Sequence, residues 1–262
     1  MVAKFQAMTS STSQSKLIRK ILFAIIWLVI WQVVSICVNN KILLAGPIEV
    51  VKSLVVLVGD GAFRVAVGAS IGRICLGFLL GSLAGFVLAT LSYRFPIIEE
   101  FFSPLVTVIK AVPVVSFIIL VLIWSGPSVA TVISSLVVFP VIFLNTLHGL
   151  KATDLKLLEM CSVYGVSFWD KLIYIYLPAL KPFLMSSISL AAGMAWKSGI
   201  AAELIDQTTN SLGNGLYRAK INLLTADLLA WTVATVILAF LFEKLLLLAL
   251  RLIPGGSKGG KA

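Results

Sequence analysis

Only one pattern in this chain has the spacing of a chemical site, and it lies in the last residues. These read GGSKGGKA, in which Gly255, Gly260 and Lys261 are spaced as in a nucleotide-binding P-loop. A P-loop also needs a Ser or Thr after the lysine, a strand before it and a helix after it, because backbone N–H groups at the helix N-terminus hold the phosphates. Here Ala262 follows the lysine. We therefore expect residues 251–262 to form a flexible basic tail.

The other reactive side chains do not combine into a catalytic or metal-binding set. The single histidine, His148, falls at an expected helix end, where a histidine interacts with the helix terminus more often than it acts as a base. The three cysteines, Cys37, Cys75 and Cys161, have neither metal-ligand nor disulfide spacing. We expect the chain not to be an enzyme and to bind no metal or cofactor itself.

The composition is that of an integral membrane protein. Hydrophobic residues make up 60% of the 262 residues, and charged residues make up 12%, about half the charged fraction of a soluble domain. The apolar residues come in runs of about 20, the length at which a helix crosses the hydrocarbon layer. We predict an all-α membrane fold with one transmembrane domain over residues 17–250, after a disordered segment, 1–16. The six expected spans cover residues 17–38, 63–91, 104–124, 128–150, 177–204 and 226–250.

The second expected span carries glycines four or five residues apart. Small residues at this spacing lie along one side of a helix and let another helix pack closely against it. The five are Gly68, Gly72, Gly77, Gly81 and Gly85.

Lysine and arginine residues predict the orientation of the spans. They are concentrated in the segments that face the cytoplasm if both termini are inside, and basic loops favour the cytoplasmic side. The net charge of +10 is explained in the same way, so no nucleic-acid partner is needed. Residues 151–176 then form a cytoplasmic segment.

This segment predicts two short helices joined by a tight turn. The first is expected to end at Gly165, because glycine adopts a left-handed conformation at little cost. Ser167, with Asp170 three residues later, is a capping-box pattern for the second helix. Pro178 predicts a bend where the chain returns to the membrane, since proline lacks a backbone donor and clashes with the preceding turn.

The segment also carries an apolar stripe, which a simple connector does not need. A connector needs only a few residues and neither a stripe nor caps, so we interpret the segment as a docking element. The stripe residues recur every three or four positions and are Leu155, Leu158, Ser162, Val166 and Trp169.

The segment resembles the EAA loop of ABC importer permeases, whose pattern is E-A-A-x-x-x-G-x9-I-x-L-P. Glu159 supplies the acid and Gly165 follows six residues later, while Ile175, Leu177 and Pro178 close the pattern. The match therefore includes the acid, the glycine of the turn and the proline at the membrane.

Two positions depart from this pattern, since Met160 and Cys161 replace the alanines. The wider chain is similar to the nitrate, sulfonate and taurine branch of the family over roughly residues 20–250. The stretches that carry this similarity are GPIEVV, IKAVPVVSFIILVLIWSG, FPVIFLNTLHGL, AAELI and SLGNGL.

The resemblance implies a type I importer permease in a bacterial plasma membrane, as a homodimer or half of a heterodimer. It implies two cytoplasmic ATPase subunits, which hold ATP and magnesium, and an external protein that delivers the solute. The solute expected for this branch is a small anion or organic compound, such as nitrate, a sulfonate, taurine or bicarbonate. The residues that the resemblance assigns to ATPase coupling are Glu159, Met160, Cys161, Gly165, Ser167, Asp170 and Pro178.

Charged residues within the spans are candidates for a solute pathway, because they are costly in a membrane. Lys197, beside Ser198, could meet an anion or could instead form a salt bridge with Glu203 or with another helix. Lys110 could line the pathway or extend to the interface. Arg73 could pair with backbone carbonyls or with a neighbouring helix. Glu203 matches the family's acid and begins a polar loop that we expect either to close the outer gate and meet the external binding protein or to be a plain structural turn.

Two other classes of protein remain open. One is a membrane scaffold whose docking element binds a different cytoplasmic partner and which has no pathway. The other is a secondary carrier, which is disfavoured because none of the eleven acidic residues is central in an expected span.

Overall fold

A computed structural model describes residues 2–125 and 129–251, and every regular element in these ranges is a helix. The elements are α1 (Val2–Val38), α2 (Pro47–Gly59), α3 (Gly61–Arg94), α4 (Pro96–Ala111), α5 (Val114–Ser125), α6 (Val129–Lys151), α7 (Leu155–Val163), α8 (Phe168–Lys171), the π-helix η2 (Leu172–Tyr176), α9 (Leu177–Asp206), α10 (Leu212–Ile221) and α11 (Thr225–Arg251).

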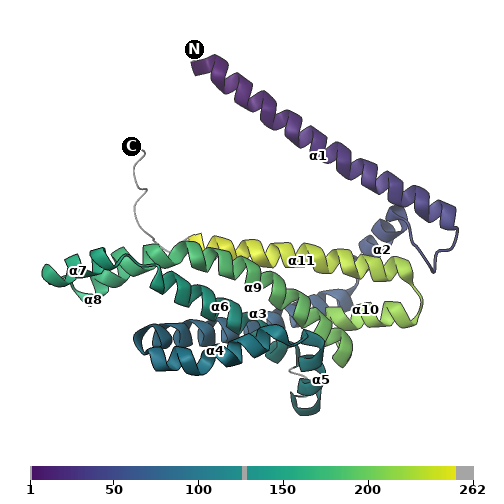
Figure 1. Cartoon of the computed structure of the whole chain (residues 1–262). Coiled ribbons are helices and arrows are strands. Elements are labelled where there is room, and N and C mark those ends of the chain that lie inside the picture. The colour runs from purple at the N-terminus through teal and green to yellow at the C-terminus, as the bar shows by residue number, and fades with distance from the viewer. Residues whose placement is uncertain (1, 126–128, 252–262) are drawn as a thin grey trace.

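The described residues confirm the predicted all-α membrane fold. Five helices are long and apolar enough to cross a membrane, and the bent pair formed by α4 and α5 makes a sixth candidate span. In the body of the molecule α6 packs against both α3 and α9, and α11 runs along α9 (Figure 1). The main core lies among these helices, where Phe78, Ile142 and Trp196 are buried.

Three of the five regularly spaced glycines of α3 explain how closely α3 approaches α6. A Cβ atom at Gly77, Gly81 or Gly85 would lie only 2.4 to 2.8 Å from a backbone carbonyl oxygen of α6. A Cβ atom at Gly68 or Gly72 would meet nothing within 4 Å. The predicted small-residue face is therefore used over its second half only.

This difference gives a matched pair of substitutions. Gly81→Ala is expected to lower the free energy of unfolding by about 1–3 kcal/mol, because the helices must separate to admit the methyl group. Gly68→Ala is expected to leave it unchanged or to raise it by up to about 1 kcal/mol, since that position is exposed and alanine favours a helix more than glycine does. Thermal unfolding of the two purified variants in detergent, followed by circular dichroism, compares them. Equal midpoints would contradict the close packing of α3 on α6.

The expected third span, 104–124, is wrong as a single helix. The first half begins earlier, at Pro96, and α4 and α5 meet at an angle of 102°. The break falls at Val112 and Pro113, because proline cannot donate to the preceding turn and its ring clashes with it. Lys110 consequently lies in the last turn of α4, where it is exposed.

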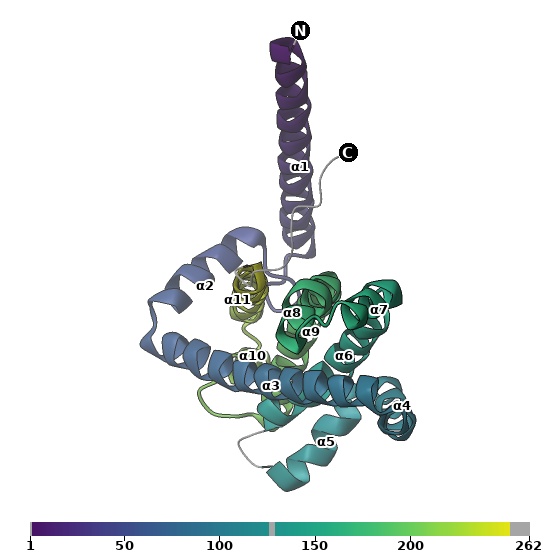
Figure 2. The ribbon, with the colours of Figure 1, turned by 90° about the vertical axis from the view of Figure 1, so that its left-hand side faces the viewer.

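Helix α1 corrects the predicted disorder of residues 1–16, because it is helical from Val2 onward. Residues 2–16 contain neither glycine nor proline, so the helix of the first span can continue through them. Helix α1 diverges from the body in both views (Figures 1 and 2). Near the C-terminal end of α1, the Trp31 indole N–H donates to the Ala45 carbonyl at 3.1 Å. The predicted basic tail covers residues 251–262, and all of it except Arg251 lies outside the described residues.

Candidate functional site

Residues 151–176, the predicted docking element, form an elbow between α6 and α9. Its first helix, α7, is capped at its start and ends in a left-handed glycine. The Asp154 carboxylate accepts from the backbone N–H of Lys156 at 2.9 Å and caps α7. Gly165 has φ +62°. The N–H of Val166 donates to the Cys161 carbonyl at 3.0 Å. A left-handed residue with this bond is a Schellman motif, which stabilises the helix end. The predicted role of Gly165 in the turn is confirmed.

The second half of the elbow has the predicted serine cap. The Ser167 hydroxyl accepts from the backbone N–H of Asp170 at 3.2 Å and donates to the Asp170 carboxylate at 2.7 Å. Helix α8 then leads through η2 directly into α9. The bend expected at Pro178 stays a prediction; what the structure shows before this proline is the π-helical turn η2, whose wider backbone accommodates the missing N–H and the bulk of the proline ring.

The surface of the elbow carries aromatic and apolar side chains that the rest of the described chain does not cover. Tyr164 is 77% exposed, and Phe168 and Trp169 are each 68% exposed. Of the two residues that replace alanines in the EAA pattern, Cys161 is buried and Met160 is exposed. None of the five residues of the predicted apolar stripe is buried: Leu158 and Val166 are half-buried, and the other three are exposed.

The space beside Gly165 is open. A Cβ atom there would meet no atom of the described chain within 4 Å. Glu159 is also exposed. A side chain added at Gly165 would therefore disturb the left-handed turn and anything that docks on it, but not the packing of the rest of the chain.

At the end of α9 away from the elbow, a cluster of polar side chains joins α3, α9 and α10. The Glu203 carboxylate is fully buried and lies 2.6 Å from a guanidinium nitrogen of Arg73. It also accepts from the Ser70 hydroxyl at 2.6 Å and from the Gly213 N–H at 3.3 Å. Because a buried carboxylate needs a counter-charge and several donors, this cluster, Ser70–Arg73–Glu203–Gly213, fixes three helices to one another.

The loop before α10 is tied to the same arginine. The second terminal nitrogen of Arg73 donates to the carbonyls of Thr209 and Asn210 at 3.5 and 3.4 Å. The prediction that Arg73 pairs with carbonyls or with a neighbouring helix is confirmed on both counts. Among the described residues, the ion pair of Glu203 is thus made with Arg73 and not with Lys197.

The four residues proposed from the sequence for a pathway are not brought together. Ser198 and Glu203 are buried, whereas Lys197 and Lys110 are exposed and lie on different helices, α9 and α4. The sequence analysis did not predict the pairing of Arg73 with Glu203. Two opposite charges in predicted spans could have indicated it, since each lowers the cost of burying the other.

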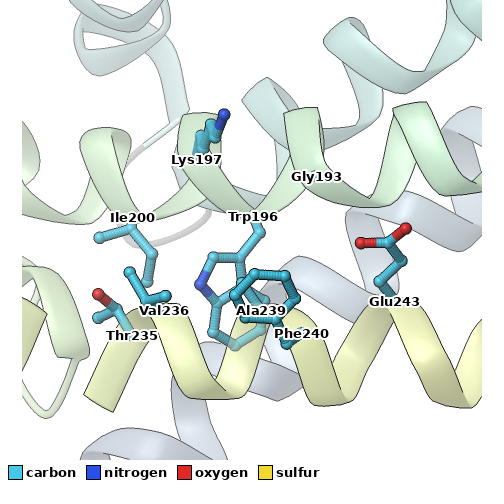
Figure 3. A pocket seen from close by; sticks show the side chains of 9 residues that line it. All are labelled: Gly193, Trp196, Lys197, Ile200, Thr235, Val236, Ala239, Phe240 and Glu243. Atoms are coloured by element: carbon cyan, nitrogen blue, oxygen red, sulfur yellow. The ribbon is translucent and has the colours of Figure 1, made fainter. Parts of the chain in front are cut away.

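A cavity of about 440 Å³ lies between α9 and α11. Figure 3 shows Trp196 projecting from α9 toward α11 and Glu243 projecting from α11 toward α9. Lys197 also borders the cavity, but its amino group points away from α11. Glu243 was not among the functional residues predicted from the sequence.

The chain belongs to the family described as the binding-protein-dependent transport system inner membrane component, whose model matches residues 77–254. Proteins of this family are permease subunits of ABC transporters, and the chain is accordingly a type I importer permease with several transmembrane helices. Its relatives are described as permeases of several transport systems.

Three relatives illustrate this range. A putative ABC transporter permease of Methanocaldococcus jannaschii is 27% identical over 205 residues, which cover 76% of each chain. The taurine transport system permease of Escherichia coli is 26% identical over 78% of this chain and 76% of its own. The nitrate import permease of Leptolyngbya laminosa is 25% identical over 65% of this chain and 64% of its own.

Proposed function

We propose that this permease couples to a separate cytoplasmic ATPase through the elbow formed by α7 and α8, and that it imports a small anion or small organic compound. The observation that carries the proposal is the rigid turn at Gly165, surrounded by exposed aromatic side chains. An exposed apolar patch of this kind is typical of a protein interaction site. ATP and magnesium would be held by the ATPase.

The coupling follows from the continuity of the chain. The elbow is capped at Asp154 and Ser167 and runs through η2 into α9 without a loop. A displacement of the elbow is therefore transmitted along α9 to the buried ion pair of Glu203 with Arg73. Movement of a packed helix between discrete positions is a common way to switch access to a central pathway.

The proposed assembly places both termini and the elbow in the cytoplasm and α10 outside. The distribution of basic residues supports this orientation. We further propose a second permease copy, most simply as a homodimer, and an external solute-binding protein at the α10 end. Within this assembly Lys197 and Lys110 are the exposed candidates for contact with solute and Ser198 is a buried one, while Glu203 holds three helices together.

Reconstitution with the ATPase tests the proposal. Proteoliposomes that contain the permease, the ATPase and the external protein are expected to take up solute only when ATP is supplied on the ATPase side. A scaffold would bind a cytoplasmic partner without ATP-driven uptake. A secondary carrier would transport with an ion gradient and the permease alone. Either result would overturn the proposed function.

A further inference from the structure

The end of the molecule away from the elbow carries a short helix, α2, that is apolar on two opposite faces. On the inner face Val50 is buried and, with its neighbours, packs against α11. The outer face is exposed, and its residues recur every three or four positions: Ile48, Val51, Val55 and Val58. Because α2 has only 13 residues, it is too short to cross a bilayer. An exposed apolar stripe on such a helix is typical of a helix that lies in the membrane surface.

The neighbouring spans place α2 at the level of lipid headgroups. The candidate span of α1 ends at Val38, and that of α11 begins at Thr225. The Thr225 hydroxyl donates to the Ile42 carbonyl, which lies between α1 and α2. Figure 1 shows α2 beside the end of α1 and the start of α11, at the opposite end of the molecule from α7 and α8. Two spans therefore reach the membrane surface beside α2.

A cavity of about 530 Å³ at this level, which we call the α2 cavity, is bordered by two ammonium groups and two carboxylates. They belong to Lys41, Lys52, Glu49 and Asp227. The Lys41 ammonium lies 2.8 Å from a Glu49 carboxylate oxygen, and this hydrogen bond lowers the pKa of Glu49, which is therefore charged at neutral pH. Since the Lys41 side chain is 85% exposed, the pair is weak and can open to a ligand.

The other two charged groups have capacity for further bonds. Among the described residues, Lys52 is exposed and forms no ion pair. The Asp227 carboxylate accepts from the Ser53 hydroxyl, which leaves it lone pairs for a second donor. The α2 cavity can therefore bind a ligand that carries one negative and one positive group.

The rim of the α2 cavity is apolar. Ile42, Leu223 and Leu224 border it, and all three are exposed. A second cavity of about 340 Å³ shares both lysines and Glu49 and extends to Ile36 of α1. Charged groups surrounded by exposed aliphatic side chains fit a ligand with a polar head and apolar chains better than a water-soluble one.

We propose that the α2 cavity binds the headgroup of phosphatidylethanolamine from the adjoining leaflet. The lipid phosphate accepts from Lys41 and Lys52, and the lipid ammonium donates to Glu49 and Asp227. The acyl chains lie along the exposed apolar stripe of α2. This headgroup matches the two positive and two negative groups of the site, and its ammonium supplies three N–H donors.

Two other common headgroups fit less well. Phosphatidylglycerol has the phosphate but no ammonium, so its negative charge is uncompensated beside the two carboxylates. The trimethylammonium of phosphatidylcholine has no N–H to donate, and proteins recognise it through aromatic rings. Among the described residues, those that border the α2 cavity include no aromatic side chain.

This site goes beyond the proposed function and does not depend on it, except that the outer leaflet follows from the proposed orientation. A lipid bound here would fasten α1, in which no residue from Ile18 to Val38 is buried. The two cavities are bordered by α1, by α2 and by the turn before α11, so one headgroup contacts all three.

Lipid titration of the purified full-length permease, followed by native mass spectrometry, tests the site. The probes are dioleoyl phosphatidylethanolamine, phosphatidylcholine and phosphatidylglycerol, which differ only in the headgroup. We expect phosphatidylethanolamine to bind more tightly than either of the others by about fivefold or more, because its charge-assisted hydrogen bonds are the strong kind. Equal affinities, or tighter binding of phosphatidylglycerol, would overturn the proposal.

A chain-free probe separates a lipid from a soluble ligand with the same headgroup. Glycerophosphoethanolamine is expected to bind far more weakly than the lipid, because it lacks the acyl chains that contact α2. Binding as tight as that of the lipid would show a soluble ligand and contradict the assignment to a lipid. A second permease copy seated on α2 would exclude lipid from the cavity and remove the preference among headgroups, which would also contradict it.

Three variants assign the preference to this cavity. Lys52→Gln is expected to weaken the ethanolamine and choline lipids alike, by about fivefold, since both contain the phosphate. Glu49→Gln keeps an oxygen that can accept from the Gly46 N–H, and it is expected to weaken only the ethanolamine lipid. Lys220→Gln, at an exposed lysine of α10 that does not border the cavity, is expected to change neither.

The variants also decide against the site if it is wrong. A full preference for phosphatidylethanolamine in Glu49→Gln, or unchanged binding of both lipids in Lys52→Gln, would refute the assignment. Lys52→Gln remains informative if Glu49→Gln proves unstable, because Lys52 forms no ion pair with the described chain. ATP-driven uptake without any headgroup preference would count against this site alone, and a headgroup preference without ATP-driven uptake would count against the proposed function alone.

Discussion

Replacing Gly165 with aspartate is expected to leave the permease folded and inserted but to abolish ATP hydrolysis that depends on transport. The left-handed φ of +62° disfavours a side chain, and the added carboxylate would project from a surface where the described chain has no atom within 4 Å. The cost therefore falls on the proposed ATPase interface and not on the permease core. The measurement is solute-stimulated ATPase activity of the reconstituted complex.

Two further variants separate the turn from the surface. Gly59→Asp makes the same change at a glycine that also has open space around it but lies in α2, and it should retain activity. Gly165→Asn keeps a residue that tolerates the left-handed region without adding charge, so it should retain part of the coupling. Full solute-stimulated hydrolysis by Gly165→Asp, with the ATPase still co-purifying, would refute docking at the elbow.

Removing the Arg73 guanidinium is expected to produce the largest loss of stability. Arg73→Met leaves the fully buried Glu203 carboxylate without its counter-charge. Breaking a buried ion pair from one side typically costs about 3–5 kcal/mol. The variant also loses the bonds to the loop before α10. Chemical unfolding in mixed micelles should therefore show a markedly lower free energy of unfolding.

The control variants test whether the loss comes from the unpaired carboxylate. Arg64→Met changes an exposed arginine of the same helix and should be nearly neutral. Arg73→Met combined with Glu203→Gln removes both charges, so it should recover a large part of the lost stability. If the double variant were as unstable as the sum of the two single variants, the ion pair would not be the source of the effect.

Local sequence patterns were sufficient to predict the turn and the second cap of the elbow. Gly165 and Ser167 act through bonds to residues within a few positions along the chain, so their spacing alone predicts the turn and the second cap. The all-α membrane fold was predictable for a similar reason. A helix satisfies its own backbone groups, and its length in a bilayer follows from its apolar run.

Properties that depend on neighbouring helices were only partly predictable. The spacing of five glycines indicated a close helix contact, but not that only Gly77, Gly81 and Gly85 would make it. A proline such as Pro113 interrupts a helix locally, whereas the 102° bend between α4 and α5 depends on how both halves pack. Residues 2–16 looked disordered by composition and are helical as a continuation of the first span.

By itself, the sequence determined the membrane class, the elbow with its glycine turn and the resemblance that the family match confirms, because these depend on composition and on short-range spacing. Only the tertiary structure decided that Arg73 pairs with Glu203 across 130 residues, and that Trp196 and Glu243 border one cavity. The physical reason is that a buried charge or donor takes whichever partner the packing of the helices brings to it, and spacing along one helix does not specify its neighbour on another.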